Sequence, residues 1–360
     1  MKKYYVLEEY KESNKRRSVK HHRRNLISKE KKRRKSASKI GKSKKQIKEE
    51  YLKSKYEIIS PPVKFSFINS PEETIEFINK LEAQYKKRNE VFVDLQNLEE
   101  LDYSAISILV SVMFTFQSRG IQFDGNYPNE PSLKKLLIDS DFFKYLFRPV
   151  RTKLEYNIGK QNQIFTMANK EVNSELGIAV MIEASQTIWG KKRICKGLQR
   201  VLLELMHNTN NHAEVGGKGT KHWWLSVNHN QKEQKVSFVF IDYGVGIFES
   251  LKNKPTKSKW FGVFEKVYEN YKHSSTSEMF KLLLEGKVHM TVTGQHFRGK
   301  GIPGIKEVQD RNQIDKLHFI SNDVSANVSA NSYIKLANNF SGTFVYWEIN
   351  QNNISSEWTI

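Results

Sequence analysis

The chain has 360 residues, of which 38% are hydrophobic and 27% charged, a composition typical of a folded protein with two or three domains. Its single cysteine, Cys195, excludes an intramolecular disulfide, argues against a cysteine-based zinc site and fits a reducing cytoplasm. No run of about 18 apolar residues occurs and no apolar segment follows the N-terminal charges. We therefore expect neither a membrane-spanning helix nor a secretory signal.

The formal net charge of +20 is concentrated in a basic arm, residues 1–58. Residues 1–60 hold 22 Lys and Arg against 7 Asp and Glu, a net of +15. The run from Lys15 to Lys48 has few apolar residues to bury, so we expect disorder or a solvated helix. Clustered Lys and Arg favour a polyanion such as nucleic acid through counterion release, with 1–50 as the contact. A solubilising tail and an anionic membrane surface are the alternatives.

Residues 60–152 alternate between strand and helix patterns, which predicts a small α/β domain. Asp102 or Ser104 can cap a helix that ends near Gly120, where a left-handed residue suits glycine. The expected strands are 63–68, 91–95 and one that begins at 121, and the expected helices are 71–86, 102–120 and 141–147.

The segment Leu101-Asp102-Tyr103-Ser104-Ala105 resembles the turn of STAS domains, the domains of anti-sigma-factor antagonists. Those proteins carry an Asp-Ser-Ser-Gly-like turn, and its second serine is phosphorylated in the regulated members. The resemblance makes Ser104 the candidate phosphoacceptor, whereas Tyr103 and Ala105 replace the usual first serine and glycine. An ordinary helix cap is the alternative role of Ser104.

Residues 192–213 carry apolar side chains at helical spacing, which predicts a helix with one face in a core. Glu204, Asn208 and His212 recur every four residues, so they lie along one helix edge. Such an edge can present a carboxylate, an amide and an imidazole to one ligand, although a solvated edge has the same pattern. The core-facing stripe comprises Ile194, Leu198, Val201, Leu202, Leu205 and Met206.

Three glycine-containing segments follow in order. A predicted strand over 236–241 ends in Asp242-Tyr243-Gly244-Val245-Gly246, whose glycines permit a tight turn and close approach of a ligand. The run Arg298–Ile305 leads into a predicted helix over 305–310, where backbone N–H groups can bind phosphate. Ser341-Gly342-Thr343 precedes a last strand, 344–349.

Taken together, these segments resemble the GHKL ATPases, which include gyrase, the chaperone Hsp90, histidine kinases, MutL and the anti-sigma-factor serine kinases. The resemblance implies a Bergerat-type α/β sandwich over 165–350 that binds ATP with Mg²⁺. Residues 248–298 then form a long lid, with a predicted helix near 277–285. No phosphoacceptor-helix or receiver pattern is present, which disfavours a two-component kinase. Pro303 departs from the family's usual glycine-rich run.

The resemblance also implies a role for each site residue. Asn208 binds the Mg²⁺ that bridges the ATP phosphates, and Glu204 is the general base. Asp242 binds the adenine amino group, and Thr343 supports it. His212 orients the end of the helix, while His207 points away. The adenine pocket is shaped by Gly244 and Gly246, and the phosphate segment comprises Gly299, Lys300 and Gly301.

A GHKL-like domain joined to a STAS-like domain implies a bacterial, cytoplasmic switch. The protein is then an ATPase or an anti-sigma-like serine kinase, with an internal or separate STAS-like partner. Relatives often dimerise, so the resemblance also admits a homodimer. Two alternatives stay open, namely an ATP-gated nucleic-acid-associated protein that uses residues 1–50 and a non-catalytic nucleotide-binding module.

Overall fold

The computed structural model describes residues 24–25, 27–29, 31–32, 44–140, 165–169, 172–212, 223–252, 275–287, 301–353 and 358. The chain divides into two compact units, residues 1–58 and 59–360. The longest described element of the first unit is α2 (Lys44–Lys55), whose last turn carries Lys53 and Lys55. No helix within the described residues is long and apolar enough to cross a membrane.

The second unit is a mixed α/β structure, as the sequence predicts. Its first part contains a short parallel pair, β3 with β5, and a second parallel pair, β2 with β4. The elements of this part are β2 (Lys64–Phe65), α3 (Pro71–Lys87), β3 (Val91–Val93), β4 (Glu100–Leu101), α4 (Tyr103–Ser118), β5 (Phe123–Gly125) and α5 (Pro131–Asp139), while β1 (Glu57–Ile59) spans the boundary between the two units.

Local signals explain most of these bounds. Pro71 starts α3, where its missing N–H costs nothing. Asp102 caps α4, since its Oδ1 accepts the Ala105 N–H at 2.9 Å. Gly120 follows α4 with a φ of +71°, as expected.

One expectation for this part needs correction, one helix was not expected, and one expectation lies outside the described residues. The strand predicted over 63–68 is only β2, because the Ser66 hydroxyl accepts the N–H groups of Ile68 and Asn69 and turns the chain toward α3. The structure adds α5, which begins at Pro131 and was not predicted. The predicted helix over 141–147 lies outside the described residues.

The second part is built on a five-stranded sheet of order β6-β7-β8-β10-β9, in which every neighbouring pair is antiparallel. Its strands are β6 (Phe165–Asn169), β7 (Trp223–Asn230), β8 (Lys235–Asp242), β9 (Asp315–Asn327) and β10 (Ser332–Ile349). Its helices are α7 (Ser174–Trp189), α8 (Lys196–His212), α9 (Ile247–Lys252), α11 (Thr276–Leu284) and α12 (Gly301–Asp310).

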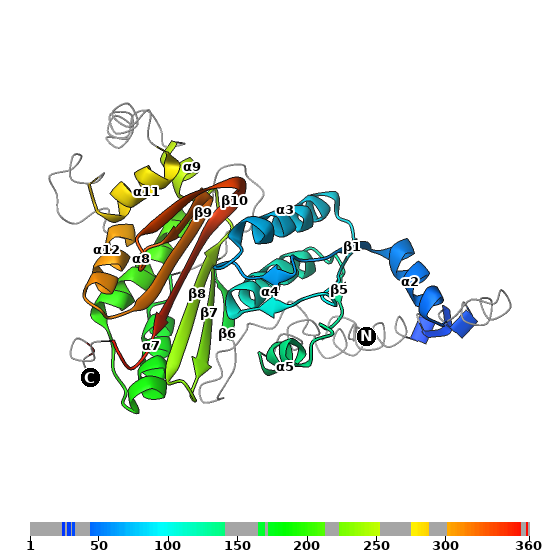
Figure 1. The fold of residues 1–360 in the computed structure, drawn as a ribbon, viewed down its shortest axis with the longest axis horizontal. Helices are drawn as coiled ribbons and strands as arrows, with labels where there is room; N and C mark the ends of the chain where they lie inside the picture. Colours follow the sequence, from blue (N-terminus) through cyan, green and yellow to red (C-terminus); the bar gives the residue numbers. More distant parts are fainter. Residues whose placement is uncertain are drawn as a thin grey trace, which may run out of the picture. The chain divides into compact units, whose positions relative to one another are not determined.

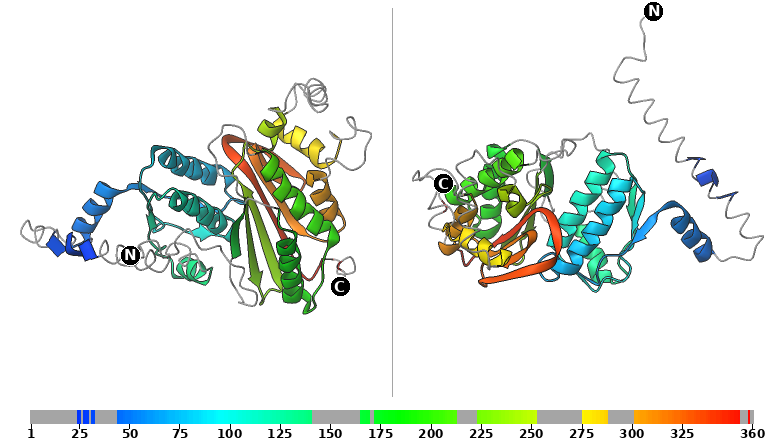
Figure 2. Two further views of the ribbon diagram at one scale, coloured as in Figure 1. Left: turned by 180° about the vertical axis from the view of Figure 1, so that it is seen from behind. Right: turned by 90° about the horizontal axis from the view of Figure 1, so that it is seen from above.

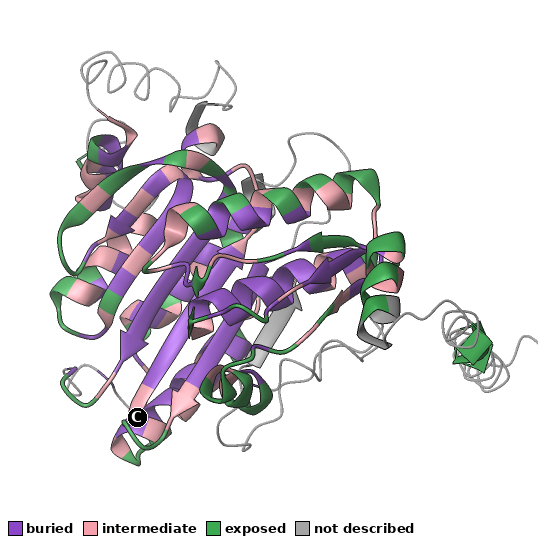
Figure 3. Cartoon of the chain, turned by 45° about the vertical axis from the view of Figure 1, so that its right-hand side comes forward, coloured by how far each residue is buried: buried purple, intermediate pink, exposed green. Residues whose placement is uncertain are grey.

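Alternation along the strands gives the sheet two apolar faces. On β10, Val345 and Trp347 point into the core formed with α7, α8, α11 and α12. Phe344 and Tyr346 point the opposite way, into a core shared with α3 and α4. The sheet therefore lies between two helical layers, and its strands are mostly buried (Figures 1, 2 and 3).

Aromatic contacts join the α3–α4 layer, residues 64–118, to the sheet. The Phe67 ring meets the rings of Phe340 at 5.1 Å and Phe344 at 4.6 Å, edge to face. Phe114 on α4 meets Trp224 on β7 at 4.9 Å. The parts predicted as separate domains, 60–152 and 165–350, thus share one hydrophobic core.

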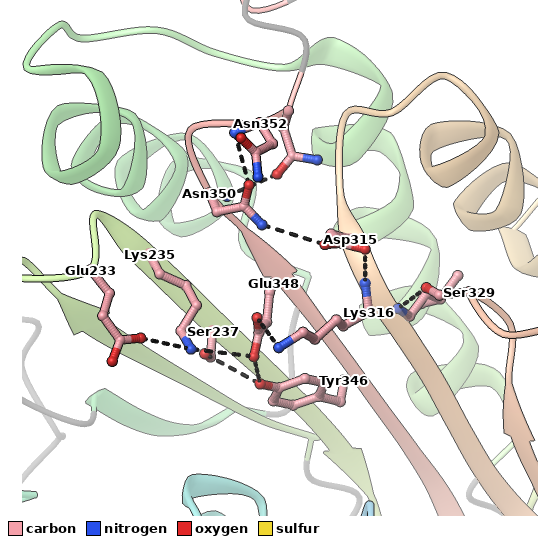
Figure 4. Close-up of polar contacts among 12 residues, drawn as sticks. Glu233, Lys235, Ser237, Asp315, Lys316, Ser329, Tyr346, Glu348, Asn350 and Asn352 are labelled. Atoms are coloured by element: carbon pink, nitrogen blue, oxygen red, sulfur yellow. Dashed lines mark hydrogen bonds and ion pairs between the residues drawn. The ribbon is translucent and has the colours of Figure 1, made fainter.

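The far end of β10 carries a buried polar cluster on the same face (Figure 4). Glu348 is 4% exposed and is paired with Lys316 at 3.2 Å and Lys235 at 3.8 Å. The Tyr346 hydroxyl donates to Glu348 and lies 3.3 Å from the Ser237 hydroxyl, and burial raises the pKa of Tyr346. These mutual contacts account for the buried carboxylate as a structural group.

Substituting Phe67 by Ala should lower the free energy of unfolding by about 3–5 kcal/mol, because a buried aromatic ring and its contacts are lost. Urea denaturation followed by fluorescence measures this value. Ile334→Ala is the control, since Ile334 is 57% exposed on β10 and should change stability by less than about 0.5 kcal/mol. Equal stability of the two variants would contradict a core shared between Phe67 and the sheet.

Candidate nucleotide site

Asp242 stands at the end of β8, between Trp223 of β7 and Thr343 of β10 in the sheet register. Its Oδ1 accepts the Gly244 N–H at 2.8 Å, and the Thr343 hydroxyl also bonds the carboxylate. Burial raises the pKa of Asp242 to about 6, and these two donors oppose the shift. The residue is partly exposed, so an oriented carboxylate stands at the end of a buried strand.

The turn after Asp242 is held by two side chains of β9. The buried Ser321 and Asn322 accept the N–H groups of Ile247 at 2.9 Å and Phe248 at 3.0 Å. Asn322 also donates to the Val245 carbonyl at 2.9 Å. These bonds fasten the start of α9 to the sheet and set the path of the Asp242–Gly246 turn.

Gly246 and Gly342 each occupy a position that a larger residue would not fit. Gly246 has a φ of +81°, and a Cβ there would lie 2.5 Å from the Asn322 Oδ1. Gly342 has a φ of +144°, and a Cβ there would overlap the Asp242 carbonyl oxygen. Glycine thus allows both β9 and β10 to approach the turn closely.

Helix α8 forms as predicted, and its apolar stripe faces the core. Glu204 is partly buried on this helix, and Asn208 lies one turn further on. The side chains of Asn208 and His212 lie outside the described part, whereas His207 is exposed. The structure therefore places the Glu204–Asn208 edge on α8 without a described contact to Asp242.

Helix α12 runs antiparallel to α8. Gly304 approaches Val201, while Val308, one turn later on α12, is close to Gly197, one turn earlier on α8. The N-terminus of α12 therefore points toward the half of α8 that carries Glu204 and Asn208. A helix N-terminus has unpaired N–H groups and partial positive charge, so this end of the pair suits an anion.

The predicted helix over 305–310 begins earlier, at Gly301, so α12 includes Ile302, Pro303 and Gly304. Pro303 fits there because first-turn N–H groups have no partner within a helix. Gly299 and Lys300 lie outside the described residues. The helix predicted near 277–285 is α11, where Ser275 and Glu278 form a capping box.

Ser104 lies at the first turn of α4 and is 1% exposed. Its hydroxyl donates to Asp102 Oδ1 at 2.5 Å and accepts the Phe67 N–H at 2.9 Å. Ser66 donates to the other Asp102 oxygen at 2.5 Å. The serine thus belongs to a buried capping network, and phosphorylation there would first require this helix start to open.

Tyr103, the residue before Ser104, contacts the sheet. Its hydroxyl bonds the Asn228 side chain of β7, and burial raises the pKa of Tyr103. A serine at this position is too short for the same contact. Tyr103 therefore helps to hold α4 against the sheet.

Sequence reasoning missed Ser321 and Asn322, the side chains that hold the turn. The only local signal is a polar Ser-Asn-Asp triplet inside an apolar strand run, and Asn322 has a φ of +52°. Their partners lie 74 residues earlier in the chain.

Comparison with protein-family models gives no match, and comparison with curated proteins finds no similar protein. Among the residues that the structure describes, no group of three or more His, Cys, Asp or Glu side chains could hold a metal ion.

Substituting Gly246 by Ala should destabilise the protein by about 1–3 kcal/mol, because a left-handed backbone and a contact with Asn322 are both strained. Thermal and urea unfolding measure the loss. Gly177→Ala is the matched control, since Gly177 lies within α7 with open space around it and alanine should stabilise a helix by about 0.5–1 kcal/mol. Unchanged stability in Gly246→Ala would contradict the turn geometry.

Proposed function

We propose that the protein binds Mg-ATP at the Asp242 turn and acts as a nucleotide-dependent regulatory switch of the GHKL type. The observation that carries the proposal is the Asp242–Gly244–Thr343 arrangement. An exocyclic amine such as that of adenine donates hydrogen bonds, and a fixed carboxylate at a strand end accepts them. A backbone N–H and a hydroxyl hold that carboxylate in one orientation.

The antiparallel α8–α12 pair supplies the phosphate end of the proposal. The positive N-terminus of α12 and the Glu204–Asn208 edge of α8 lie at the same end of the helix pair. An amide oxygen and phosphate oxygens are the kind of ligand that Mg²⁺ takes. Asn208 would hold the ion, and Glu204 would orient the attacking water or hydroxyl. Gly301, the first residue of α12, has no side chain and would let phosphate approach this helix end.

The output of such a switch is the α3–α4 layer, which carries the STAS-like turn and packs against the sheet. Because Ser104 is buried and hydrogen-bonded, the geometry favours a conformational response over direct phosphorylation of Ser104. A GHKL-type kinase acting on a separate STAS-like protein belongs to the same proposal and has the same ATP requirement.

Titration calorimetry with Mg-ATP tests the proposal on the full chain. We expect the wild type to bind, and Asp242→Asn to lose at least about tenfold in affinity, because an amide offers one acceptor oxygen in place of two. Asp242→Asn should unfold at the same or a higher temperature at pH 7, since burial raises the pKa of Asp242 and so disfavours its charged form. A wild type that does not bind Mg-ATP would reject the proposal.

Two further variants separate a turnover enzyme from a binding module. Glu204→Ala should keep Mg-ATP binding and lower phosphate release by about 10²-fold or more. Asn208→Ala should lose the dependence of ATP binding on Mg²⁺. Gln199→Ala, on the same helix, is the control. Mass spectrometry after incubation with Mg-ATP measures whether Ser104 is phosphorylated. If the wild type binds Mg-ATP but releases no phosphate, the protein is a binding module and not a turnover enzyme.

Adenine binding should weaken as the pH falls through 6. The carboxylate form of Asp242 accepts the amine hydrogen. Because the pKa of Asp242 is about 6, a lower pH protonates this carboxylate, and the neutral carboxyl group is a weaker acceptor. At pH 5 the affinity should be roughly tenfold lower than at pH 8. Adenosine, which has no titrating phosphate, is the probe, with NMR titration as the measurement. A flat profile between pH 8 and 5 would contradict the role of Asp242.

A further inference from the structure

Tyr243 links the candidate nucleotide site to the α3–α4 layer. It directly follows Asp242, and its hydroxyl lies 2.6 Å from the Ser111 hydroxyl on α4. Its ring meets the Phe340 ring edge to face at 6.2 Å. The residue is 36% exposed, yet burial raises the pKa of Tyr243, so its hydroxyl stays protonated.

The direction of this hydrogen bond follows from the other partner of Ser111. Ser111 is fully buried, and its hydroxyl donates to the Ile108 carbonyl at 2.7 Å within α4. A hydroxyl has one hydrogen, so Ser111 accepts and Tyr243 donates. The Asp242 turn is thereby fixed to the middle of α4, two helical turns after Ser104.

A second set of contacts reaches the other strand that forms the site. The Glu72 carboxylate on α3 accepts from the Asn338 backbone N–H at 2.7 Å and from its side-chain amide at 3.0 Å. Asn79 of α3 donates to the Asn339 carbonyl at 3.2 Å. This part of β10 is irregular, with register shifts on both sides of Phe340, and it leads directly into Gly342 and Thr343.

The α3–α4 layer therefore contacts both chain segments that hold the Asp242 carboxylate. Helix α4 holds the turn on one side through Ser111, and α3 holds the β10 segment on the other through Glu72. We propose that the α3–α4 layer senses occupancy of the Asp242 site and that Tyr243 is the positioning residue that couples the two. This inference rests on the proposed function, because it concerns regulation of the same site.

Coupling of this kind is reciprocal, which makes it measurable from both ends. Ligand binding at Asp242 should tighten α4, and loosening of the Tyr243–Ser111 contact should weaken ligand binding. Removal of one neutral hydrogen bond corresponds to a loss of about three- to tenfold in affinity.

Hydrogen exchange of the full chain, with and without Mg-ATP, tests the effect on α4. In the wild type, ATP should slow exchange of amides in 103–118. In Tyr243→Phe this response should disappear, although the protein remains folded by circular dichroism. A residue that only stabilised the fold would change exchange equally with and without ATP.

Calorimetry tests the reverse direction with matched variants. Tyr243→Phe and Ser111→Ala should each weaken Mg-ATP binding about three- to tenfold, and the double variant should be no weaker than either single one. Ser118→Ala is the control for Ser111, because Ser118 lies on α4, is exposed and makes the same local bond to a carbonyl three residues back, that of Thr115, at 2.7 Å. Tyr127→Phe, at an exposed tyrosine 40% accessible, controls for loss of a phenol.

The outcomes distinguish this inference from the function on which it rests. If the wild type binds Mg-ATP while α4 exchange is unchanged and both variants bind normally, the coupling is overturned and the proposed function stands. If the wild type does not bind Mg-ATP, the proposed function fails and the coupling fails with it. Should Tyr243→Phe unfold, Ser111→Ala provides the same measurement from the other side of the bond.

Discussion

The apolar second face of the five-stranded sheet is the constraint on which the rest of the second unit depends. Alternation along β8 and β10 leaves Val239, Ile241 and Phe344 on this face, and exposed side chains of this size would cost a large hydrophobic free energy. The α3–α4 layer covers them. The cover and the sheet thus share one core, which extends along β8 to Ile241, the residue before Asp242.

Several neighbouring segments hold the Asp242 carboxylate and its turn. Asp242 is held within its own turn by Gly244, from β10 by Thr343, and its turn is held from β9 by Ser321 and Asn322. Such a carboxylate has lost part of its solvation while keeping hydrogen-bond donors that fix its direction. The lost solvation raises the pKa of Asp242, whereas the two donors oppose that shift. Fixed donors around one acceptor are the common feature of preorganised polar sites.

The start of α4 does more than cap a helix. Asp102, Ser104 and Ser66 form a closed hydrogen-bonding network at the start of α4, and Tyr103 reaches the sheet. This helix start therefore connects the layer to the sheet as well as capping α4. The same helix carries Ser111, which contacts Tyr243 beside Asp242, two helical turns after Ser104.

Local chemistry alone determined several features of this protein. Pro71, Asp102 and the capping box of α11 set helix starts, and the spacing of Leu198, Val201 and Leu205 predicted which face of α8 is buried, because these signals act within one or two helical turns. Tertiary structure decided the rest. Ser321 and Asn322 act 74 residues from their partners, Tyr243 acts 132 residues from Ser111, and Glu72 acts 266 residues from Asn338. No pattern in the chain announces such pairs, since only the folded sheet brings them together.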